Sequence, residues 1–490
     1  MLELLEARAQ FDGPERTAHV RIAEQAGRIY LDLADERWRA VEIGPDGWRV
    51  VSHPPVRFRR PPGLLAIPAP QREGTINLLA PFLNVPTQND FVLVVMWLLA
   101  TLRPGGPYPP LVISGEQGSA KSALAKFLKA LVDPSAAPAR ALPREDRELF
   151  IAAHNGHVLT FDNLSSLPSG VSDTLCRLAS GGSLAVRRLY TDQDEVLFDA
   201  ARPMILNGIE DFVTRPDLGD RAIFLALRPI DDANRRSEPA LWRDFEMARP
   251  LILGALFDAA THALRVLPQV RLERLPRMAD FVLRATACET TLWPAGTFAR
   301  AYAANRSAAV DRVIDADPVA DAVRAIMSDR ITWMGTASDL LRAAADLAGD
   351  DMATRSAGWP KNPRMLAGRL RRAQTFLRTL GIEIVFGREG HAGTRKIETP
   401  SGPSATSATM ARGQSQGNRK YRRMAARRTI GADAADAKDH IVLTVGTSLG
   451  RTKSGRWQTT LRRLRHRSFS SSGNSVPMWV CARWCRCCPA

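Results

Sequence analysis

The stretch LVISGEQGSAKSALAKFL, residues Leu111–Leu128, decides the fold of this chain. Its centre fits the phosphate-binding loop template G-x-x-x-x-G-K-[ST] except at one position, where Ala120 replaces the last glycine. The loop residues are Gly115, Glu116, Gln117, Gly118, Ser119, Ala120, Lys121 and Ser122. Such a loop works because backbone N–H groups and a helix N-terminus converge on phosphate oxygens, and glycine lets the chain curl closely. Because a methyl group is the smallest departure from glycine, we interpret the stretch as a nucleotide-binding loop.

The residues around the loop support this interpretation. An apolar run predicts a strand that ends at Ser114, and a helical pattern follows from Ser122 to Val132. Lys121 would contact the phosphates of ATP, and the Ser122 hydroxyl would coordinate Mg²⁺. ATP and Mg²⁺ are therefore the expected ligands.

Charge and cysteine divide the chain into a body and a tail. The 490 residues carry a formal net charge of +16, but residues 401–490 hold 17 Lys and Arg against three Asp and account for +14 of it. The tail contains no Glu and four of the six Cys, and its composition predicts disorder. A shifted reading frame and a weak terminal zinc site are open alternatives for it, and the amino terminus could be truncated.

Composition shifts divide the chain into five parts. We predict a small β-rich unit with a Pro-rich linker, an ATPase core, a helical lid, a winged helix-turn-helix and a basic tail, at residues 1–73, 74–232, 233–314, 315–400 and 401–490. Apolar runs that alternate with helical segments indicate a parallel sheet covered by helices, with a β-hairpin inserted before the third run. The lid is expected to be helical with interruptions at Pro250, Pro268, Pro276 and Pro294. No segment resembles a membrane span or a signal peptide, so a cytoplasmic location is expected.

A metal-binding carboxylate is expected at the end of the next apolar strand, HVLTFDNLSS. Asp162 ends this strand and is the natural second ligand for Mg²⁺ or its water shell. The alternative is a structural Asp that caps the following turn. Its neighbour is Asn163, which cannot accept a proton as a carboxylate can, so hydrolysis is expected to be slow unless Glu116 substitutes at a distance.

With these motifs in place, the chain resembles the AAA+ ATPases. Within them it is similar to the helicase-like ATPases of bacteriophage and plasmid primase-helicase proteins, relatives of the superfamily 3 helicases. The resemblance covers roughly residues 74–400 and rests on GEQGSAKS, LTFDN, RPMILNG and RPDLGDRAIFLAL in the family order. It implies a P-loop NTPase core, a ring of identical subunits such as a hexamer, and action on DNA.

The resemblance also implies roles for single residues. Asn207 matches the sensor 1 residue, which contacts the γ-phosphate or the attacking water. Arg221 matches the arginine finger that completes a neighbouring subunit's site, with Arg215 as second choice, although a surface ion pair of Arg221 with Asp217 or Asp220 is the alternative. Arg277 could serve as sensor 2.

Two groups of arginines are candidates for DNA binding. Arg187 and Arg188 precede the acidic tip 192–194 of the predicted hairpin. On the third helix of the predicted winged helix, Arg364, Arg371, Arg372 and Arg378 fall on one face, and Leu366, Leu370, Phe376, Leu377 and Leu380 occupy the opposite arc. A solvated charged face is the alternative to a DNA contact.

From these observations we expect a Mg²⁺-dependent ATPase of mobile-element type that acts on DNA as a helicase-like replication motor. The competing hypothesis is an ATP-gated DNA-binding or loader protein that hydrolyses little. Asn163 and the small amino-terminal unit would suit the second hypothesis.

Overall fold

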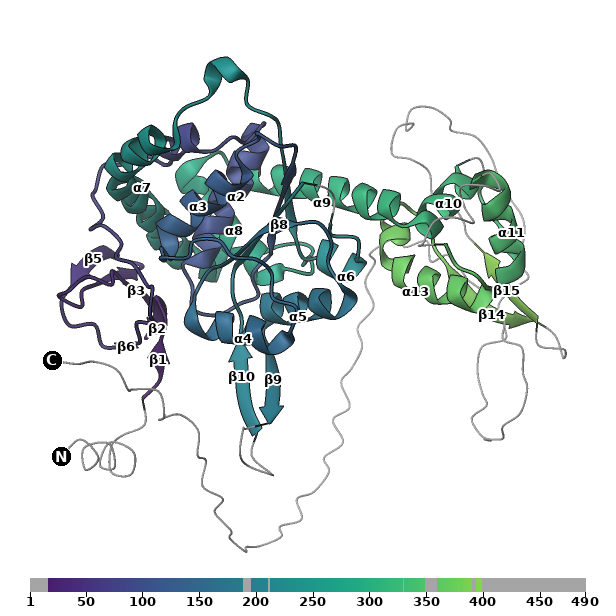
Figure 1. The fold of residues 1–490 in the computed structure, drawn as a ribbon, viewed down its shortest axis with the longest axis horizontal. Coiled ribbons are helices and arrows are strands. Elements are labelled where there is room, and N and C mark those ends of the chain that lie inside the picture. The colour runs from purple at the N-terminus through teal and green to yellow at the C-terminus, as the bar shows by residue number, and fades with distance from the viewer. Residues whose placement is uncertain are drawn as a thin grey trace, which may run out of the picture.

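The structure is a computed structural model that describes residues 16–187, 195–209, 212–328, 330–348, 359–389 and 394–398 (Figure 1). A small β unit comes first, a layered α/β core follows, and a small helical part comes last. The long helix α9 (Thr297–Ala316) runs from the core to the helical part (Figure 1). The predicted tail, its four cysteines and the predicted hairpin tip lie outside the described residues.

The amino-terminal unit is built from short strands that alternate apolar and polar residues. Four of them form an antiparallel sheet in the order β2-β3-β4-β5: Ile22–Gln25, Arg28–Asp32, Ala40–Gly44 and Gly47–Val51. The two-residue strands β1 (Ala18–His19) and β6 (Arg57–Phe58) pair beside this sheet. The Trp48 indole donates to Asp258 Oδ1 at 2.8 Å, which joins this unit to the core.

A buried arginine fixes the unit on the core. The Arg21 Nε atom lies 3.2 Å from Asp133 Oδ1, and its other nitrogens donate to the carbonyls of Asp32 and Leu65 at 2.9 and 2.7 Å. Burial would raise the pKa of Asp133, but the charges of Lys129 and Arg21 outweigh burial and hold that pKa well below the usual carboxyl range. A buried guanidinium with a full set of acceptors leaves the unit little freedom to move.

The Pro-rich stretch after β6 is fixed on the core, although its composition suggests a free linker. Along it, the N–H groups of Leu65, Ile67 and Gln71 donate to the carbonyls of Pro134, Leu33 and Pro250 at 2.9 to 3.0 Å. Proline fixes φ in such a segment at low entropic cost, so an irregular chain can be ordered by a few hydrogen bonds.

The core is a parallel sheet covered by helices on both faces. Its strand order is β12-β7-β11-β8, with bounds Ile223–Leu227, Leu111–Gly115, Met204–Gly208 and Leu159–Leu164. Successive residues of a strand point to opposite faces. Accordingly, Leu111 and Ile113 pack into one hydrophobic cluster, and Val112 packs into the other. The prediction of a mixed α/β fold with a parallel sheet is confirmed.

Helices contribute the two outer layers (Figure 1). One cluster contains residues of α2 (Gln88–Thr101), α3 (Lys121–Val132), α7 (Glu238–Val266) and α8 (Ala279–Leu292). The other contains residues of α4 (Asp146–Asn155), α5 (Ser169–Ser180) and α6 (Pro216–Gly219). Between β8 and β11, strands β9 (Gly182–Arg187) and β10 (Glu195–Ala200) pair antiparallel as a hairpin that projects from the core.

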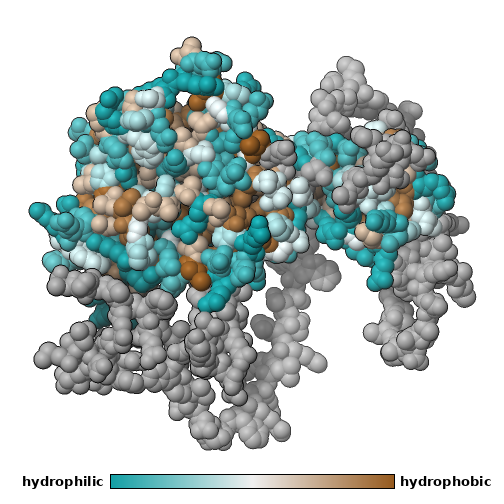
Figure 2. Space-filling model, in the orientation of Figure 1, coloured by the Kyte–Doolittle hydropathy of each residue, from teal (hydrophilic) through white to brown (hydrophobic). Residues whose placement is uncertain are grey.

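Helix α7 passes through Pro250 without a break, so the interruption expected there is wrong. Proline removes one helical hydrogen bond, and burial of Phe245, Ile252 and Phe257 in the core stabilises the helix on both sides of it. By length and composition alone, the segment Glu238–Gln269 is also apolar enough to cross a membrane, a test that buried core helices pass as well. On the face shown in Figure 2, hydrophobic residues are scattered among hydrophilic ones.

The carboxy-terminal part has its own hydrophobic cluster. The helices described in it are α10 (Pro318–Met327), α11 (Ala337–Ala348) and α13 (Pro363–Thr379). They pack with a small antiparallel sheet in the order β13-β15-β14, whose bounds are Met334–Gly335, Thr394–Glu398 and Val385–Glu389. Within the described residues, the three helices and the paired strands β14 and β15 come in the order that the sequence predicts, whereas the sequence does not predict the short strand β13 between α10 and α11.

Candidate nucleotide site

The loop between β7 and α3 curls back on the sheet, and its backbone explains the residue types. Gly115 has φ +152°, and a Cβ there would lie 2.5 Å from the carbonyl oxygen of Leu227. Gly118 has φ +78°. Both positions require glycine because their φ is positive, and at Gly115 a side chain would also collide with the Leu227 carbonyl. Helix α3 begins directly after the loop, so the unpaired N–H groups of its first turn face the curl.

Ala120, the departure from the template, occupies the left-handed region with φ 59° and ψ 29°. A left-handed conformation costs a non-glycine residue about 1–2 kcal/mol. There is room for the Ala120 methyl group, but the left-handed backbone of this residue is strained. Strain of this kind persists only where the surrounding structure determines the backbone.

Lys121 folds back over its own loop. Its Nζ donates to the carbonyl oxygens of Gly115 and Glu116, both at 2.8 Å, and lies 3.4 Å from Ser119 Oγ. Burial lowers the pKa of Lys121, and the charge of Asp162 acts in the opposite direction. Lys121 is thus a cation held at the mouth of the loop by weak carbonyl acceptors.

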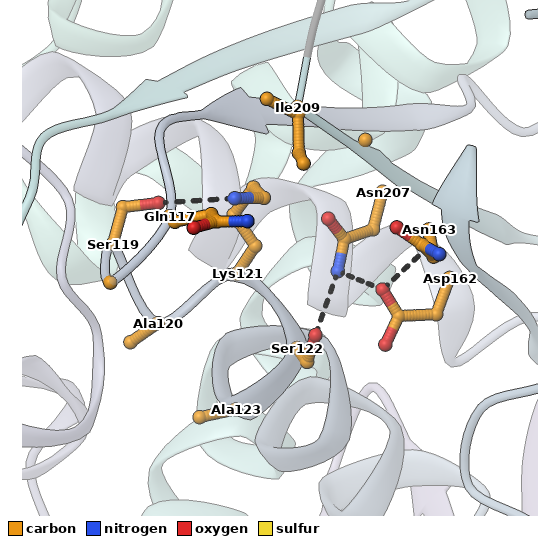
Figure 3. A pocket seen from close by; sticks show the side chains of 12 residues that line it. Gln117, Ser119, Ala120, Lys121, Ser122, Ala123, Asp162, Asn163, Asn207 and Ile209 are labelled. Carbon is orange, nitrogen blue, oxygen red and sulfur yellow. Dashed lines mark hydrogen bonds between the residues drawn. The ribbon is translucent and has the colours of Figure 1, made fainter. Parts of the chain in front are cut away.

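Polar side chains from two neighbouring strands meet beside the loop (Figure 3). Asn207 of β11 donates through Nδ2 to Asp162 Oδ1 at 2.6 Å, and the same nitrogen lies 3.4 Å from Ser122 Oγ. The backbone N–H of Asn163 also donates to Asp162 Oδ1, at 2.8 Å. Since β8 and β11 are parallel neighbours, their carboxyl ends meet at the edge where the loop lies.

The Asn207 amide is oriented by these contacts. Because a carboxylate only accepts, the atom that faces Asp162 must be the amide nitrogen, and the oxygen points the other way. Asn207 is 1% exposed, and among the described residues its Oδ1 has no hydrogen-bond partner. A buried acceptor of this kind is satisfied by a ligand or a water.

Together these residues enclose a cavity of about 450 Å³ at the carboxyl edge of the sheet. Of the sequence-predicted residues, it is lined by Gln117, Gly118, Ser119, Ala120, Lys121, Ser122, Asp162, Asn163 and Asn207. Its volume lies within the roughly 300–1,000 Å³ of pockets that hold drug-sized ligands. The Glu116 side chain is exposed.

Asn163 also has a left-handed backbone, with φ 58°. Asparagine tolerates this conformation better than most residues, because its short side chain can hydrogen-bond locally. Its amide lines the cavity next to Asp162 (Figure 3). The left-handed backbone at position 163 therefore favours Asn over Glu, the residue that could act as a catalytic base there.

Sequence reasoning missed three residues that support the loop from the far side. Asn84 Nδ2 donates to the carbonyls of Ser119 and Arg228 at 3.0 and 2.7 Å. The Ile230 N–H donates to the Gly118 carbonyl at 3.1 Å. The Arg235 guanidinium lies 3.3 Å from the place that a Cβ of Gly118 would occupy. Only the paired Arg235 and Arg236 after β12 offer a sequence signal, and it is weak.

Arg221 lies at the amino-terminal end of the sheet's strands, whereas the loop of its own chain lies at their carboxyl end. It precedes β12, whose last residue Leu227 pairs with Gly115, so six residues of extended chain, roughly 20 Å, separate Arg221 from the loop. Its guanidinium donates to the Asp217 carbonyl at 2.6 Å and to Ser180 Oγ at 3.2 Å. Its distance to Asp217 Oδ1 is 3.8 Å, so the predicted surface pair exists within this chain.

Arg215 and Arg277 lie at the amino-terminal end of the strands as well. Arg215 pairs with Asp173 at 2.8 Å, and Arg277 pairs with Asp220 at 3.2 Å. Arg277 is therefore far from the loop of its own chain. The interpretation of Arg277 as a sensor for its own nucleotide is not compatible with this position.

The two candidate DNA-binding groups differ in how far they are described. Arg187 ends strand β9, and Arg188 lies outside the described residues. On α13, Arg364, Arg371, Arg372 and Arg378 are exposed, whereas Leu366, Leu370, Phe376 and Leu377 are buried. Leu380 is 37% exposed, so its assignment to the packed arc is wrong, because the helix ends at Thr379.

Two contacts orient the arginine face of α13. The Arg371 guanidinium lies over the Phe386 ring, 4.9 Å from its centroid, and Arg378 lies 3.9 Å from Glu383. Such an exposed ion pair contributes little to stability. The face therefore keeps a positive surface.

Comparison with solved structures finds low similarity to the NrS-1 C terminal region. An A form apo structure of that region shares 12% identity at a TM-score of 0.35, over 74% of this chain and 95% of that one. A second apo structure shares 12% identity at 0.30, over 68% and 77%, and another A form structure shares 11% at 0.31, over 76% and 96%. No curated protein sequence matches the chain.

Two family models match along the chain. The model of the actinomycete integrative conjugative element replication protein matches residues 76–315, and the model of the AICE RepA C-terminal domain matches residues 319–410. The two matches meet between α9 and α10 and together span about two thirds of the chain. The chain therefore belongs to the family of actinomycete integrative conjugative element replication proteins.

Proposed function

We propose that this mobile-element replication protein is a Mg²⁺-dependent ATPase of the AAA+ class that acts on DNA as a helicase-like motor. One observation carries the proposal: one cavity is lined by Lys121 and Ser122 from the start of α3 and by Asp162 and Asn207 from two adjacent strands. These are the residue types that phosphoryl transfer requires, namely a cation, a hydroxyl, a carboxylate and a polar group for water.

The loop fits a triphosphate. Gly115 and Gly118 let the backbone curl where a side chain would collide or be strained, and the first turn of α3 directs N–H groups into the curl. Lys121 would exchange its two carbonyl acceptors for phosphate oxygens. The phosphate oxygens carry full negative charge and the carbonyls do not, so Coulomb attraction to the ammonium favours this exchange.

The residues beside the loop fit Mg²⁺. Ser122 Oγ and the Asp162 carboxylate would hold the ion or its water shell, and both are oxygen donors, which Mg²⁺ prefers. Asn207 and the Asn163 N–H orient the carboxylate in advance through Oδ1. When bound, Mg²⁺ neutralises charge on the phosphates.

Asn207 would position the attacking water. Its Nδ2 is engaged by Asp162, so its unpartnered Oδ1 would accept a hydrogen bond from water. Asn163 can orient the same water but cannot remove its proton. Because phosphoryl transfer proceeds through a loose transition state in most analyses, hydrolysis without a carboxylate base is slow rather than impossible.

The second candidate function is an ATP-gated DNA-binding or loader protein, and Asn163 is the observation that favours it. Asp162→Asn separates the two. For a motor, we expect this change to lower the rate of phosphate release by about 100-fold or more, since it removes a charge that holds the metal, while ATP affinity changes by less than about tenfold.

The measurement is phosphate release and ATP affinity for the wild type and for Asp162→Asn. Asp173→Asn, on the surface of α5, is the control. The result that would contradict the motor is a wild type that releases phosphate no faster than Asp162→Asn. If the DNA affinity of that wild type also differs between ATP and ADP, the protein is an ATP-gated DNA-binding or loader protein.

Arg235 would supply a second cation to the phosphates within the same chain. At present it pairs with Asp232 at 2.8 Å, and both side chains are largely exposed, so the pair is weak. We expect Arg235→Ala to weaken ATP binding by about tenfold, the loss of one charged hydrogen bond. Asp232→Ala should tighten it, because Arg235 loses its competitor.

Arg236→Ala is the matched control, since this neighbour pairs with Asp244 on α7. ATP affinity for the three variants can be measured by titrating a fluorescent ATP analogue. Equal affinities for Arg235→Ala and Arg236→Ala would remove Arg235 from the site.

We propose that the carboxy-terminal part is a winged helix whose α13 arginines bind DNA. Replacing Arg364, Arg371 and Arg378 with Ala should weaken DNA binding and flatten its salt dependence by up to about three phosphate contacts. Arg342→Ala, exposed on α11 of the same part, is the control.

Binding of a labelled duplex and a labelled single strand is titrated at several salt concentrations, with and without residues 401–490. Deleting this +14 segment should lower non-specific affinity by counterion release and spare structure-dependent binding. If the triple variant binds like its parent and the deletion alone eliminates binding, α13 is not the DNA contact.

A further inference from the structure

An exposed tryptophan lies on the amino-terminal β unit, in the loop of residues 33–39 between β3 and β4. Trp38 is 52% exposed. Among the residues whose exposure the structure describes, it is the one exposed residue of the types Trp, Tyr and Phe. A single apolar residue on a surface needs no explanation by itself. The backbone of Trp38, however, adds a second observation.

That backbone is in the left-handed region, with φ 56°. A bulky residue is an outlier there, because its Cβ crowds the following carbonyl oxygen, whereas glycine would fit without strain. The loop therefore keeps a large aromatic residue at a position where the backbone disfavours one. Strain of this kind clusters at functional sites.

The loop and a neighbouring arginine hold the indole in one orientation. The Trp38 N–H donates to the Asp35 carbonyl at 3.2 Å, and the Asp35 carboxylate accepts from the N–H and Nε of Arg39 at 2.9 and 2.6 Å. The Arg60 guanidinium lies over one face of the ring, with its Cζ 3.7 Å from the centroid. Two nitrogens of Arg60 donate to the buried Asp32 carboxylate at 2.9 and 2.7 Å, which fixes the plane of the guanidinium.

The opposite face of the indole is open. Because Arg60 covers one face, the exposed surface of Trp38 lies on the other face and the ring edge. In the described part of the chain, no aromatic ring stacks on Trp38, and its indole N–H has no hydrogen-bond partner. The adjacent Arg37 is exposed and forms no ion pair with these residues, and the exposed Glu36 offsets part of its charge.

We propose that Trp38 stacks on a base of single-stranded nucleic acid and that Arg37 contacts a neighbouring phosphate. Every base has a flat face, so an aromatic platform with adjacent arginines binds single strands without reading their sequence. Bases inside a duplex already stack on one another, so the platform favours a single strand. The proposal rests on the action of this replication protein on DNA, but it does not require ATP hydrolysis.

The test compares Trp38→Ala and Trp38→Phe with Leu65→Ala, an exposed apolar control from the Pro-rich stretch. All are made in the full chain, so the α13 arginines and residues 401–490 are the same in every protein. A short labelled oligothymidine is titrated without ATP. We expect the Kd to rise about tenfold in Trp38→Ala, the loss of one stacked base. Trp38→Phe should recover part of that loss, and Leu65→Ala should bind like the wild type.

A labelled abasic strand of the same length separates stacking from phosphate binding. The wild type and Trp38→Ala should bind this ligand equally, because it has no base to stack. Arg37→Gln should weaken binding of both ligands and lower its salt dependence by about one phosphate contact. Equal Kd values for oligothymidine in the wild type and Trp38→Ala overturn the proposal, as does an equal loss on the abasic strand. An unchanged salt dependence in Arg37→Gln overturns the phosphate contact.

Two further measurements guard against a variant that fails to fold. Trp38→Gly relieves the left-handed strain, so its melting temperature should stay near that of the wild type while oligothymidine binding falls as in Trp38→Ala. The wild-type chain is also irradiated with an oligothymidine in which one base is iodinated uracil. Cross-linking to the peptide that contains Trp38 is expected, and cross-links confined to other peptides contradict the proposal. Because ATP is absent, failure of the proposed ATPase would leave these results unchanged.

Discussion

Lys121→Ala is expected to weaken ATP binding by about 100-fold or more. The change removes the cation that lines the nucleotide cavity, and two charged hydrogen bonds at about 1.5–3 kcal/mol each correspond to that factor. The fold should survive, because Lys121 bonds only to its own loop within the described residues. Equilibrium binding of labelled ATP with Mg²⁺ measures the effect.

The matched control is Lys126→Ala, on the same helix. Lys126 pairs with Glu238 at 3.1 Å and lies away from the cavity lining. Its loss should leave ATP affinity unchanged. Near-wild-type affinity in Lys121→Ala would remove the premise of the proposed function.

Arg221→Ala is expected to bind ATP normally and to hydrolyse it about 1,000-fold more slowly, the loss typical of a missing arginine finger. Roughly 20 Å of extended backbone separates Arg221 from the loop of its own chain, so we propose that it acts on the site of the next subunit in a ring. To do so it must release the Asp217 carbonyl and Ser180 Oγ, and also its partly buried contact with the Cys176 thiol. Arg243→Ala, exposed on α7, is the control.

Mixing Arg221→Ala with Lys121→Ala tests the arrangement between subunits. In a ring assembled at random from equal amounts, roughly a quarter of the interfaces join an intact loop to an intact Arg221. Hydrolysis should therefore rise when the two inactive proteins are mixed. If oligomers shown to contain both variants recover no hydrolysis, Arg221 does not act on the site of a neighbouring subunit and is an ordinary surface residue.

The sequence places Asp162 and Asn207 at the same end of the sheet, because each ends an apolar run and the carboxyl ends of parallel strands lie together. Only the structure shows that their strands, β8 and β11, are neighbours. The curl of the loop could likewise be predicted, because its glycines fall where the template requires them.

The rest depended on packing that the sequence does not display. Ala120 is small enough for the template, but only the backbone shows that it is left-handed and strained. Arg21 sits in an ordinary alternating stretch, and nothing local indicates that it is buried against Asp133, 112 positions later. Arg235 and Asn84 reach the loop from segments far along the chain.

Two predictions are wrong where a local rule is the only guide. Such rules predict an interruption of the helix at Pro250 and a packed Leu380, because they assign each residue by its neighbours in sequence. Burial of apolar side chains on both sides of Pro250 keeps α7 continuous. Helix α13 ends at Thr379, so Leu380 lies beyond its packed face. Tertiary contacts overrule local preference at Pro250, whereas at Leu380 the helix ends before the apolar pattern does.

The most direct test of the proposed ATPase is the rate of ATP hydrolysis by the purified full chain, with and without single-stranded DNA, in the presence of Mg²⁺. We predict slow but measurable release of phosphate that DNA accelerates and that Lys121→Ala abolishes. Absence of both ATP binding and hydrolysis in the wild type, or hydrolysis that persists in Lys121→Ala, would contradict the assignment of this cavity as the site of an ATPase.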